Sequence, residues 1–131
     1  MDLLIKKAGD RGILVMLDMH RINGANNTIP ELWYSADAPE ADIISVWKTM
    51  VTRYKDYYNM VAVDVKNEPH DSIEVGTKSN KDWWYYCEKA GNELLKINKK
   101  LLIVCEGYDK YVNPQKQRWD YPGWGATIQV L

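Results

Sequence analysis

Side chains that could transfer protons gather at three places along the chain, each directly after a short apolar run. These places are Asp18-Met19-His20-Arg21, Asn67-Glu68-Pro69-His70-Asp71 and Glu106-Gly107-Tyr108. Carboxylates and imidazoles are the groups that perform general acid–base catalysis, and they also bind metals. Because the pattern recurs after three separate runs, we favour one shared site over three accidents of sequence.

The apolar runs that precede these polar groups lie near residues 13–19, 61–67 and 101–106. Each is rich in branched side chains and almost continuous, which is typical of strands covered on both faces of a parallel sheet. We therefore predict three strands. Since parallel strands end at one edge of a sheet, their polar endings should converge into a single cluster.

Two helices are predicted between the strands, near residues 42–58 and 81–98, where apolar residues recur at steps of three and four. The second helix follows a possible N-cap at Asn80. Residues 1–8 have the pattern of the end of a further helix, closed by Gly9. The remainder after the third strand is predicted to be an irregular tail.

This alternation of strands and helices predicts an α/β fold with right-handed crossovers between parallel strands. Either a doubly wound sheet or a (β/α) barrel would produce it. No G-x-G-x-x-G sequence follows any of the strands, so nothing supports a dinucleotide-binding fold. No linker divides the 131 residues, which we treat as a single domain.

Composition excludes several classes of function. The net charge is -1 and no basic block occurs, which argues against a nucleic-acid partner. No apolar run approaches the roughly 20 residues of a membrane span, and the first residues do not resemble a secretion signal. Two cysteines, Cys87 and Cys105, are too few for a disulfide-built scaffold; a single disulfide and two buried thiols both fit the predicted arrangement.

The aromatic residues are unusual, with six tryptophans, nine tyrosines and no phenylalanine. Every aromatic ring therefore carries a polar group, which suits half-wet surfaces better than a sealed core. Trp33 falls in a long loop, residues 22–41, that would lie beside the polar strand endings. It is a candidate for ligand contact, and the alternative is that it only packs.

The strand ending Asn67-Glu68-Pro69 resembles the acid/base motif of glycoside hydrolase family five, the (β/α)8-barrel cellulases. The resemblance extends over nearly the whole chain and is most specific to bacterial-type endoglucanases and their eukaryotic relatives. It covers the third-strand ending Leu17-Asp18-Met19-His20-Arg21, the following loop Leu32-Trp33-Tyr34-Ser35, the third helix at residues 47–54, the fifth strand at residues 101–107, and Trp124-Gly125 in the loop after it.

The resemblance implies a set of site residues. Glu68 would be the general acid/base, which protonates the glycosidic oxygen and later deprotonates water. Asn67 would hydrogen-bond the sugar 2-hydroxyl, and His20 would line the same subsite. Trp124 would offer a flat face for a pyranose ring, and Trp33 is a second candidate for contact with glucan.

The resemblance also implies an activity, a retaining endo-β-1,4-glucanase in a secreted parent protein, with β-glucan as its partner. The fold would be a partial (β/α)8 barrel of about three βα units, spanning residues 1–131 as an incomplete catalytic domain. The nucleophile of the family, a glutamate on strand seven, has no counterpart here. We therefore expect the isolated chain to be inactive; the missing barrel portion would be its partner if such a portion exists. The alternative is a non-catalytic remnant that at most binds glucan.

No cofactor is expected. The acidic and histidine residues of the three endings could be imagined as metal ligands: Asp18, His20, Glu68, His70 and Glu106. However, neither H-x-x-x-H nor C-x-x-C spacing occurs, and the family that the chain resembles has no catalytic metal.

Two charged residues next to the site have open roles. Lys66 could favour the ionised form of Glu68, point outward to solvent, or pair with Asp64. Asp18 would share a strand face with His20, and it could orient the imidazole.

Overall fold

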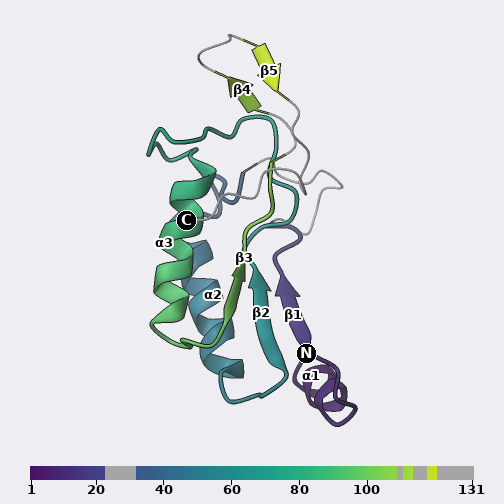
Figure 1. The fold of residues 1–131 in the computed structure, drawn as a ribbon. Helices are drawn as coiled ribbons and strands as arrows, with labels where there is room; N and C mark the ends of the chain where they lie inside the picture. Colours follow the sequence, from purple (N-terminus) through teal and green to yellow (C-terminus); the bar gives the residue numbers. More distant parts are fainter. Residues whose placement is uncertain (23–31, 109–110, 114–117, 121–131) are drawn as a thin grey trace.

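The computed structural model describes residues 1–22, 32–108, 111–113 and 118–120. Strands and helices alternate along most of the chain (Figure 1). The elements are α1 (Asp2–Gly9), β1 (Val15–Asp18), α2 (Glu40–Tyr54), β2 (Met60–Asp64), α3 (Trp83–Leu95), β3 (Leu102–Val104), β4 (Tyr111–Asn113) and β5 (Arg118–Asp120). The predicted order is confirmed as far as β3. The predicted irregular tail is wrong at residues 111–113 and 118–120, where β4 and β5 form an antiparallel pair.

The first three strands form a parallel sheet in the order β1-β2-β3, as predicted. Leu17, Val63 and Ile103 lie side by side in one row across this sheet. Because successive side chains point to opposite faces, the neighbouring row that contains Met16 and Leu102 faces the other way.

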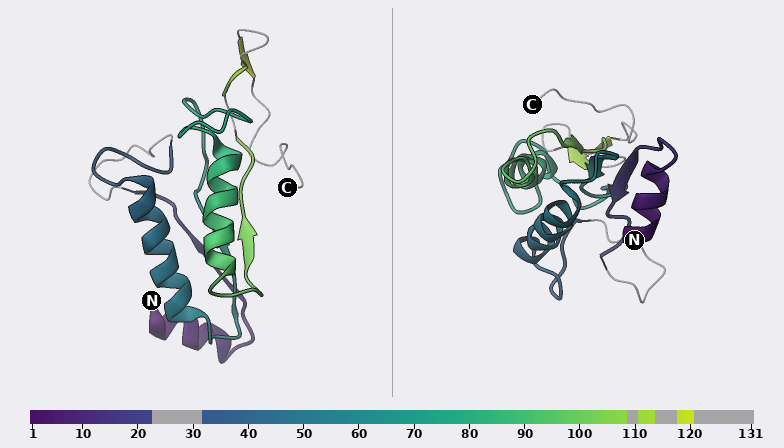
Figure 2. Two further views of the ribbon diagram at one scale, coloured as in Figure 1. Left: turned by 90° about the vertical axis from the view of Figure 1, so that its left-hand side faces the viewer. Right: turned by 90° about the horizontal axis from the view of Figure 1, so that it is seen from below.

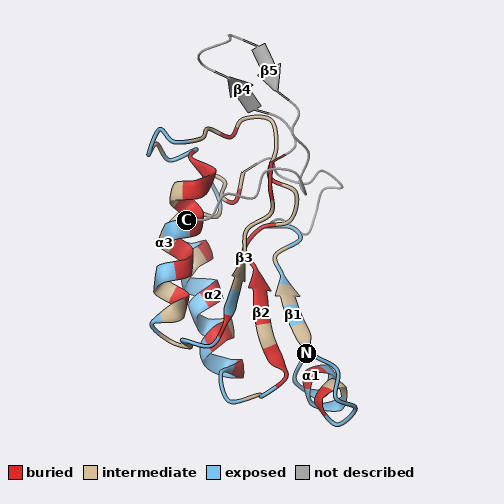
Figure 3. Ribbon diagram, viewed as in Figure 1, coloured by how far each residue is buried: buried red, intermediate tan, exposed pale blue. Residues whose placement is uncertain are grey.

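Helices α2 and α3 cover one face of the sheet (Figure 2). A Cβ atom added to Gly91 of α3 would lie 3.5 Å from Ile103, which places the helix directly on the row of apolar residues described above. The inward faces of both helices and most of β2 are buried, whereas the outward faces are exposed (Figure 3). The buried residues of α2 belong to the predicted apolar stripe: Ile43, Trp47, Val51 and Tyr54.

Aromatic residues fill much of this core, contrary to the prediction that they would favour half-wet surfaces. Two of the core tryptophans satisfy their indole N–H by hydrogen bonds to backbone carbonyls. The indole of Trp47 donates to the carbonyl of Val65 at 3.3 Å, and the indole of Trp83 donates to the carbonyl of Glu106 at 2.8 Å. Each of these buried tryptophans therefore links its helix to the segment that follows a strand, by its polar atom as well as by packing.

Helix α3 begins later than predicted, and its N-cap is Asp82 rather than Asn80. The buried carboxylate of Asp82 accepts hydrogen bonds from the backbone N–H of Tyr85 at 3.3 Å and of Lys78 at 2.7 Å. Lys78 has a left-handed backbone (φ 57°). Asp82 thus satisfies a helix N–H that has no partner within the helix, and it also fixes the preceding turn.

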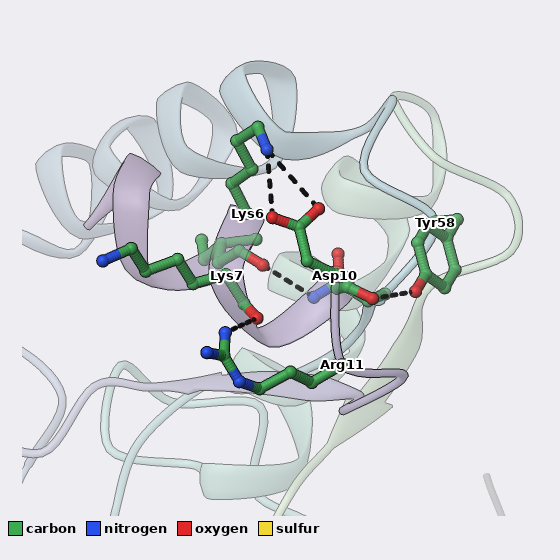
Figure 4. Close-up of polar contacts among 8 residues, drawn as sticks. Lys6, Lys7, Asp10, Arg11 and Tyr58 are labelled. Carbon is green, nitrogen blue, oxygen red and sulfur yellow. Dashed lines mark hydrogen bonds and ion pairs between the residues drawn. The ribbon is translucent and has the colours of Figure 1, made fainter.

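Helix α1 packs at the opposite edge of the sheet from the polar strand endings. Figure 4 shows its last turn, where Lys6 pairs with Asp10 and the hydroxyl of Tyr58 donates to the carbonyl of Gly9. Asn59 is buried and donates from Nδ2 to the carbonyls of Ile5 at 2.9 Å and Ile13 at 3.2 Å. Asn59 therefore joins the helix, the following turn and the start of β2.

Candidate active site

The carboxyl ends of the three strands stay paired beyond the regular sheet. The N–H of Met19 donates to the carbonyl of Asp64, and the N–H of Asn67 donates back to the carbonyl of Met19, each at 3.2 Å. The N–H of Val65 donates to the carbonyl of Val104 at 3.1 Å. These bonds place the Asn67-Glu68 segment between the end of β1 and the end of β3.

The backbone of Glu68 is held by a second carboxylate. Glu68 has a left-handed conformation (φ 49°), which is unfavourable for a residue with a side chain. Its N–H donates to Oε2 of Glu106 at 2.9 Å, and such a hydrogen bond to a charged acceptor offsets part of the cost. Glu106 is fixed in turn through its carbonyl, which accepts from the Trp83 indole.

Two histidines flank this segment. Nδ1 of His20 lies 2.9 Å from Oδ2 of Asp18, so Asp18 orients the imidazole, as the sequence suggested. Nδ1 of His70 lies 2.6 Å from the carbonyl oxygen of Glu68. Since a carbonyl only accepts, the Nδ1 atom of His70 must carry the proton. His20 is exposed, whereas His70 is half-buried.

A buried acid, Asp64, is the last residue of β2, four residues before Glu68. Asp64 is only 4% exposed, and burial, together with a hydrogen bond to Glu106, raises its pKa to about 7. Because two carboxylates can share a hydrogen bond only when one of them is protonated, the raised pKa lets Asp64 keep its proton and donate it to Glu106 up to about neutral pH.

Lys66 supplies the positive charge of this region. Its side chain is fully buried, and Nζ donates to the carbonyl of Asn67. The alternative in which Lys66 points outward to solvent is therefore wrong. Burial lowers the pKa of Lys66, while the carboxylates of Glu106, Asp18, Glu68 and Asp64 oppose this shift. A buried ammonium group among carboxylates is partly compensated by them, and it also holds the peptide next to Glu68.

The side chain of Asn67 has an unused donor. Within the described part of the chain, its Nδ2 atom is buried and has no hydrogen-bond partner. Leaving a buried donor unpaired costs about 1–3 kcal/mol, so an unpaired amide at the edge of a sheet calls for an explanation.

Trp33 lies in the core, not on the surface beside the strand endings where its position in the loop suggested it. The side chain is 0% exposed, stacks on Tyr86 with ring centroids 4.7 Å apart, and packs against Trp83. Its indole donates to Glu40 at 2.8 Å. A ring without exposed surface has no face for a sugar, so we leave Trp33 out of the site. Trp124 lies outside the described residues.

Sequence reasoning missed the part that Asp64 plays and the contact of Glu106 with the Glu68 backbone. The sequence did contain one signal for a buried acid pair. Asp64 interrupts an otherwise apolar strand, and a buried carboxylate needs a partner. Across residues 1–22 and 32–108, no three histidine, cysteine or acidic side chains are grouped so that they could hold a metal ion. Helices long and apolar enough to cross a membrane are likewise absent from the described residues.

Comparisons with known proteins agree with this architecture. The family model described as cellulase (glycosyl hydrolase family 5) matches residues 1–129. An endoglucanase of Paenibacillus polymyxa is 39% identical over 130 residues, which make up 98% of this chain and 31% of that protein. The major extracellular endoglucanase of Xanthomonas campestris pv. campestris is 32% identical over 132 residues, which make up 26% of that protein.

Solved structures give the same result. The catalytic domain of the major endoglucanase from Xanthomonas campestris pv. campestris has a TM-score of 0.84 and 31% identity, covering 98% of this chain and 36% of its own. An endocellulase from Pyrococcus horikoshii, solved with cellotetraose, has a TM-score of 0.80 and 37% identity, covering 88% of this chain and 33% of its own.

These structural neighbours are (β/α)8-barrel endoglucanases, and the sheet described here corresponds to three parallel strands of such a barrel with their helices. The chain spans between 26% and 36% of the length of the relatives named above. The match of the family model to nearly every residue, together with this fold, shows that the chain belongs to the cellulase family, glycosyl hydrolase family 5.

Proposed function

We propose that this chain carries the acid/base part of the active site of a retaining endo-β-1,4-glucanase, with Glu68 as the general acid/base. The observation that carries the proposal is the position of Glu68, half-buried at the carboxyl edge of a parallel sheet and next to the unpaired amide of Asn67. In parallel α/β barrels this edge is where catalytic residues lie. Family membership and the cellotetraose complex of the Pyrococcus horikoshii endocellulase support a β-glucan as substrate.

The proposed reaction has two steps. In the first, the carboxylic acid of Glu68 gives its proton to the glycosidic oxygen while a second carboxylate attacks the anomeric carbon and forms a glycosyl-enzyme intermediate. In the second, the Glu68 carboxylate takes a proton from water, which attacks the same carbon and releases the sugar. Both steps need Glu68 at a fixed position, and the hydrogen bond from its N–H to Glu106 supplies part of that constraint.

Neighbouring groups have roles that follow from their contacts. The unpaired Nδ2 atom of Asn67 is the donor that we propose for the sugar 2-hydroxyl, a contact that strengthens in the oxocarbenium-like transition state. His20 is held through Nδ1 by Asp18, which leaves Nε2 for a hydroxyl of the same sugar. We also propose Trp124 as a stacking surface for a further sugar.

The second carboxylate of the reaction is proposed to come from outside these 131 residues. Retention requires two carboxyl groups roughly 5 Å apart. Glu106 is the glutamate that contacts the Glu68 segment within the described residues, and its oxygen is already bound to the Glu68 N–H. It therefore serves to position Glu68. By analogy with the extracellular Xanthomonas campestris relative, we propose that the parent enzyme is secreted.

The stereochemistry of the product tests the proposed mechanism. Proton NMR of the first minutes of cellotetraose hydrolysis, by a complete enzyme that contains this segment, should show the β-anomer before mutarotation produces the α-anomer. An α-anomer that appears first would contradict retention and would require a water-activating base instead of a nucleophile.

A further inference from the structure

Two cysteines with no part in the proposed reaction meet between α3 and the end of β3. Cys87 lies in α3 and is 2% exposed, whereas Cys105 directly follows β3 and is half-buried. Both are free thiols in this structure. Free cysteines often serve only as small apolar core residues, so their relative position decides whether they can do more.

The register of helix and strand brings the two thiols together. Gly91 of α3 faces Ile103 of β3, with 3.5 Å between the nearest atoms once a Cβ is added to Gly91. The helix runs beside the strand in the opposite direction (Figures 1 and 2). Cys87 is one helical turn before Gly91, a step of about 6 Å, and Cys105 is two strand residues after Ile103, a step of about 6.6 Å. Both steps lead toward the carboxyl edge.

Direct contact between the two side chains agrees with this register. A hydrogen bond with Cys105 is among the causes that raise the pKa of the Cys87 thiol, and burial is the largest of them. Cys105 packs against the buried cluster that contains Cys87. Two thiols within hydrogen-bonding reach need only a small movement to reach the length of a disulfide.

We propose that Cys87 and Cys105 are a dithiol site that small-molecule disulfides, such as oxidised glutathione, convert into an intrachain disulfide. The more exposed Cys105 reacts first: its thiolate attacks one sulfur of the oxidant and releases one thiolate. Cys87 then loses its proton to solvent and attacks the sulfur of Cys105, which releases the second thiol. The two cysteines lose two electrons and two protons, and the oxidant is reduced to two thiols.

The expected consequence is a firmer attachment of α3 to the end of β3. Cys105 directly precedes Glu106, whose carboxylate holds the Glu68 backbone, so the disulfide would restrain the strand end that positions Glu68. The proposal does not depend on the catalytic role of Glu68, because it rests on the packing of α3 against β3.

The test uses the 131-residue chain, equilibrated with oxidised and reduced glutathione, alkylated with N-ethylmaleimide and weighed as intact protein. We expect a product two mass units lighter with no alkylation, a Cys87–Cys105 cross-linked peptide, and a melting temperature about 5–15 °C above that of the reduced chain. Because a native site favours the bond, disulfide formation should be at least about tenfold more favourable in buffer than in denaturant.

Single variants separate the two thiols. Cys87→Ser should trap a stable glutathione adduct at Cys105, whereas Cys105→Ser, with only the buried thiol, should react at least about tenfold more slowly. If a variant fails to fold, the unmodified chain still tests the proposal, because its disulfide formation can be compared in buffer and in denaturant. A folded chain that remains doubly alkylated, that forms only intermolecular dimers, or that oxidises less favourably than the unfolded chain would overturn the proposal.

Discussion

At the scale of single residues, Glu106 acts on Glu68 through the peptide backbone and not through the Glu68 side chain. Its carboxylate accepts the Glu68 N–H at 2.9 Å and also hydrogen-bonds Asp64. Lys66 holds the carbonyl of Asn67, the other end of the same peptide unit. One peptide is thus held at both of its polar atoms, at the N–H by the half-buried Glu106 and at the carbonyl by the buried Lys66, which sets the direction of the Glu68 side chain.

Replacing Glu106 tests this backbone contact. Glu106→Leu removes the acceptor, so hydrogen exchange at the Glu68 amide should accelerate by about 10- to 100-fold. Glu106→Gln retains a carbonyl oxygen and should keep most of the protection. NMR-detected exchange measures both, with the Val65 amide, bonded to the Val104 carbonyl, as an internal control. Equal exchange at Glu68 in all three proteins would show that Glu106 does not hold it.

Asp64 should make stability depend on pH in an unusual direction. Folding raises its pKa from 3.8 to about 7, so between these values the folded chain binds a proton that the unfolded chain releases. The contribution of Asp64 to the free energy of unfolding therefore falls as pH rises from about 4 to about 7 and is lowest above pH 7.

The variant Asp64→Asn mimics the protonated side chain and should remove this dependence. Urea unfolding at a series of pH values should show the variant gaining about 1–4 kcal/mol relative to the natural chain between pH 4 and 7. The exposed Asp37→Asn is the matched control and should show no such trend. A constant difference between Asp64→Asn and the natural chain across this range would contradict the raised pKa.

At the scale of elements, local sequence patterns predict the strands and helices. The predictions fail where a feature depends on contacts between residues that are far apart in the sequence. The runs that contain Val63 and Ile103 are recognisable as buried strands because most of their side chains are apolar. By contrast, burial of Trp33 depends on Tyr86 and Trp83, which lie about fifty residues further along the chain. No periodicity in the loop itself could reveal those neighbours.

The candidate site shows the same division. Its position was predictable, because polar residues follow each buried strand and parallel strands end at one edge. The contact from the Glu68 N–H to Glu106 was not, because it depends on a left-handed backbone at Glu68 that no neighbouring glycine signals. Likewise, Asp82 replaces Asn80 as the cap of α3 because its carboxylate also serves the turn at Lys78.

Asn59 helps to join α1 to the sheet, and its replacement should lower the stability of the fold. Asn59→Ala leaves the carbonyls of the buried Ile5 and the exposed Ile13 without the Nδ2 donor, and it should lower the free energy of unfolding by about 1–3 kcal/mol. Urea denaturation measures the loss, and Asn92→Ala on the exposed face of α3 is the matched control. A change below about 0.5 kcal/mol for Asn59→Ala would show that α1 does not depend on these bonds.

At the scale of the whole molecule, the face of the sheet opposite the helices is only partly covered. Met16 is 51% exposed and Leu102 is 64% exposed, on the two strands that flank β2. In a (β/α)8 barrel this face is turned inward and is packed by layers of side chains from the other strands. The edges of β1 and β3 that face away from β2 would be paired in the same way.

We therefore expect the 131-residue chain alone not to hydrolyse β-glucan at a useful rate. An acid without a nucleophile cannot form the glycosyl-enzyme intermediate. Purified chain, with its fold verified by circular dichroism, should release no more reducing ends from carboxymethyl cellulose than the Glu68→Gln variant of the same chain. Activity that survives removal of host glucanases and is lost on Glu68→Gln would show that Glu106 or self-association completes the site.

The central claim, that Glu68 is the acid/base, is tested most directly by Glu68→Gln in a complete enzyme that contains this segment. The variant retains the size of the side chain but cannot donate a proton. Turnover of cellotetraose, whose sugar leaving group is poor, should fall by about 10²–10⁴-fold, whereas the glycosylation step with aryl glycosides that carry activated leaving groups should be nearly unchanged. Glu88→Gln, the same change on the exposed face of α3, should leave both rates intact. Equal losses on both substrates, with glycosylation shown to be rate-limiting, would contradict the assignment of Glu68 as the acid.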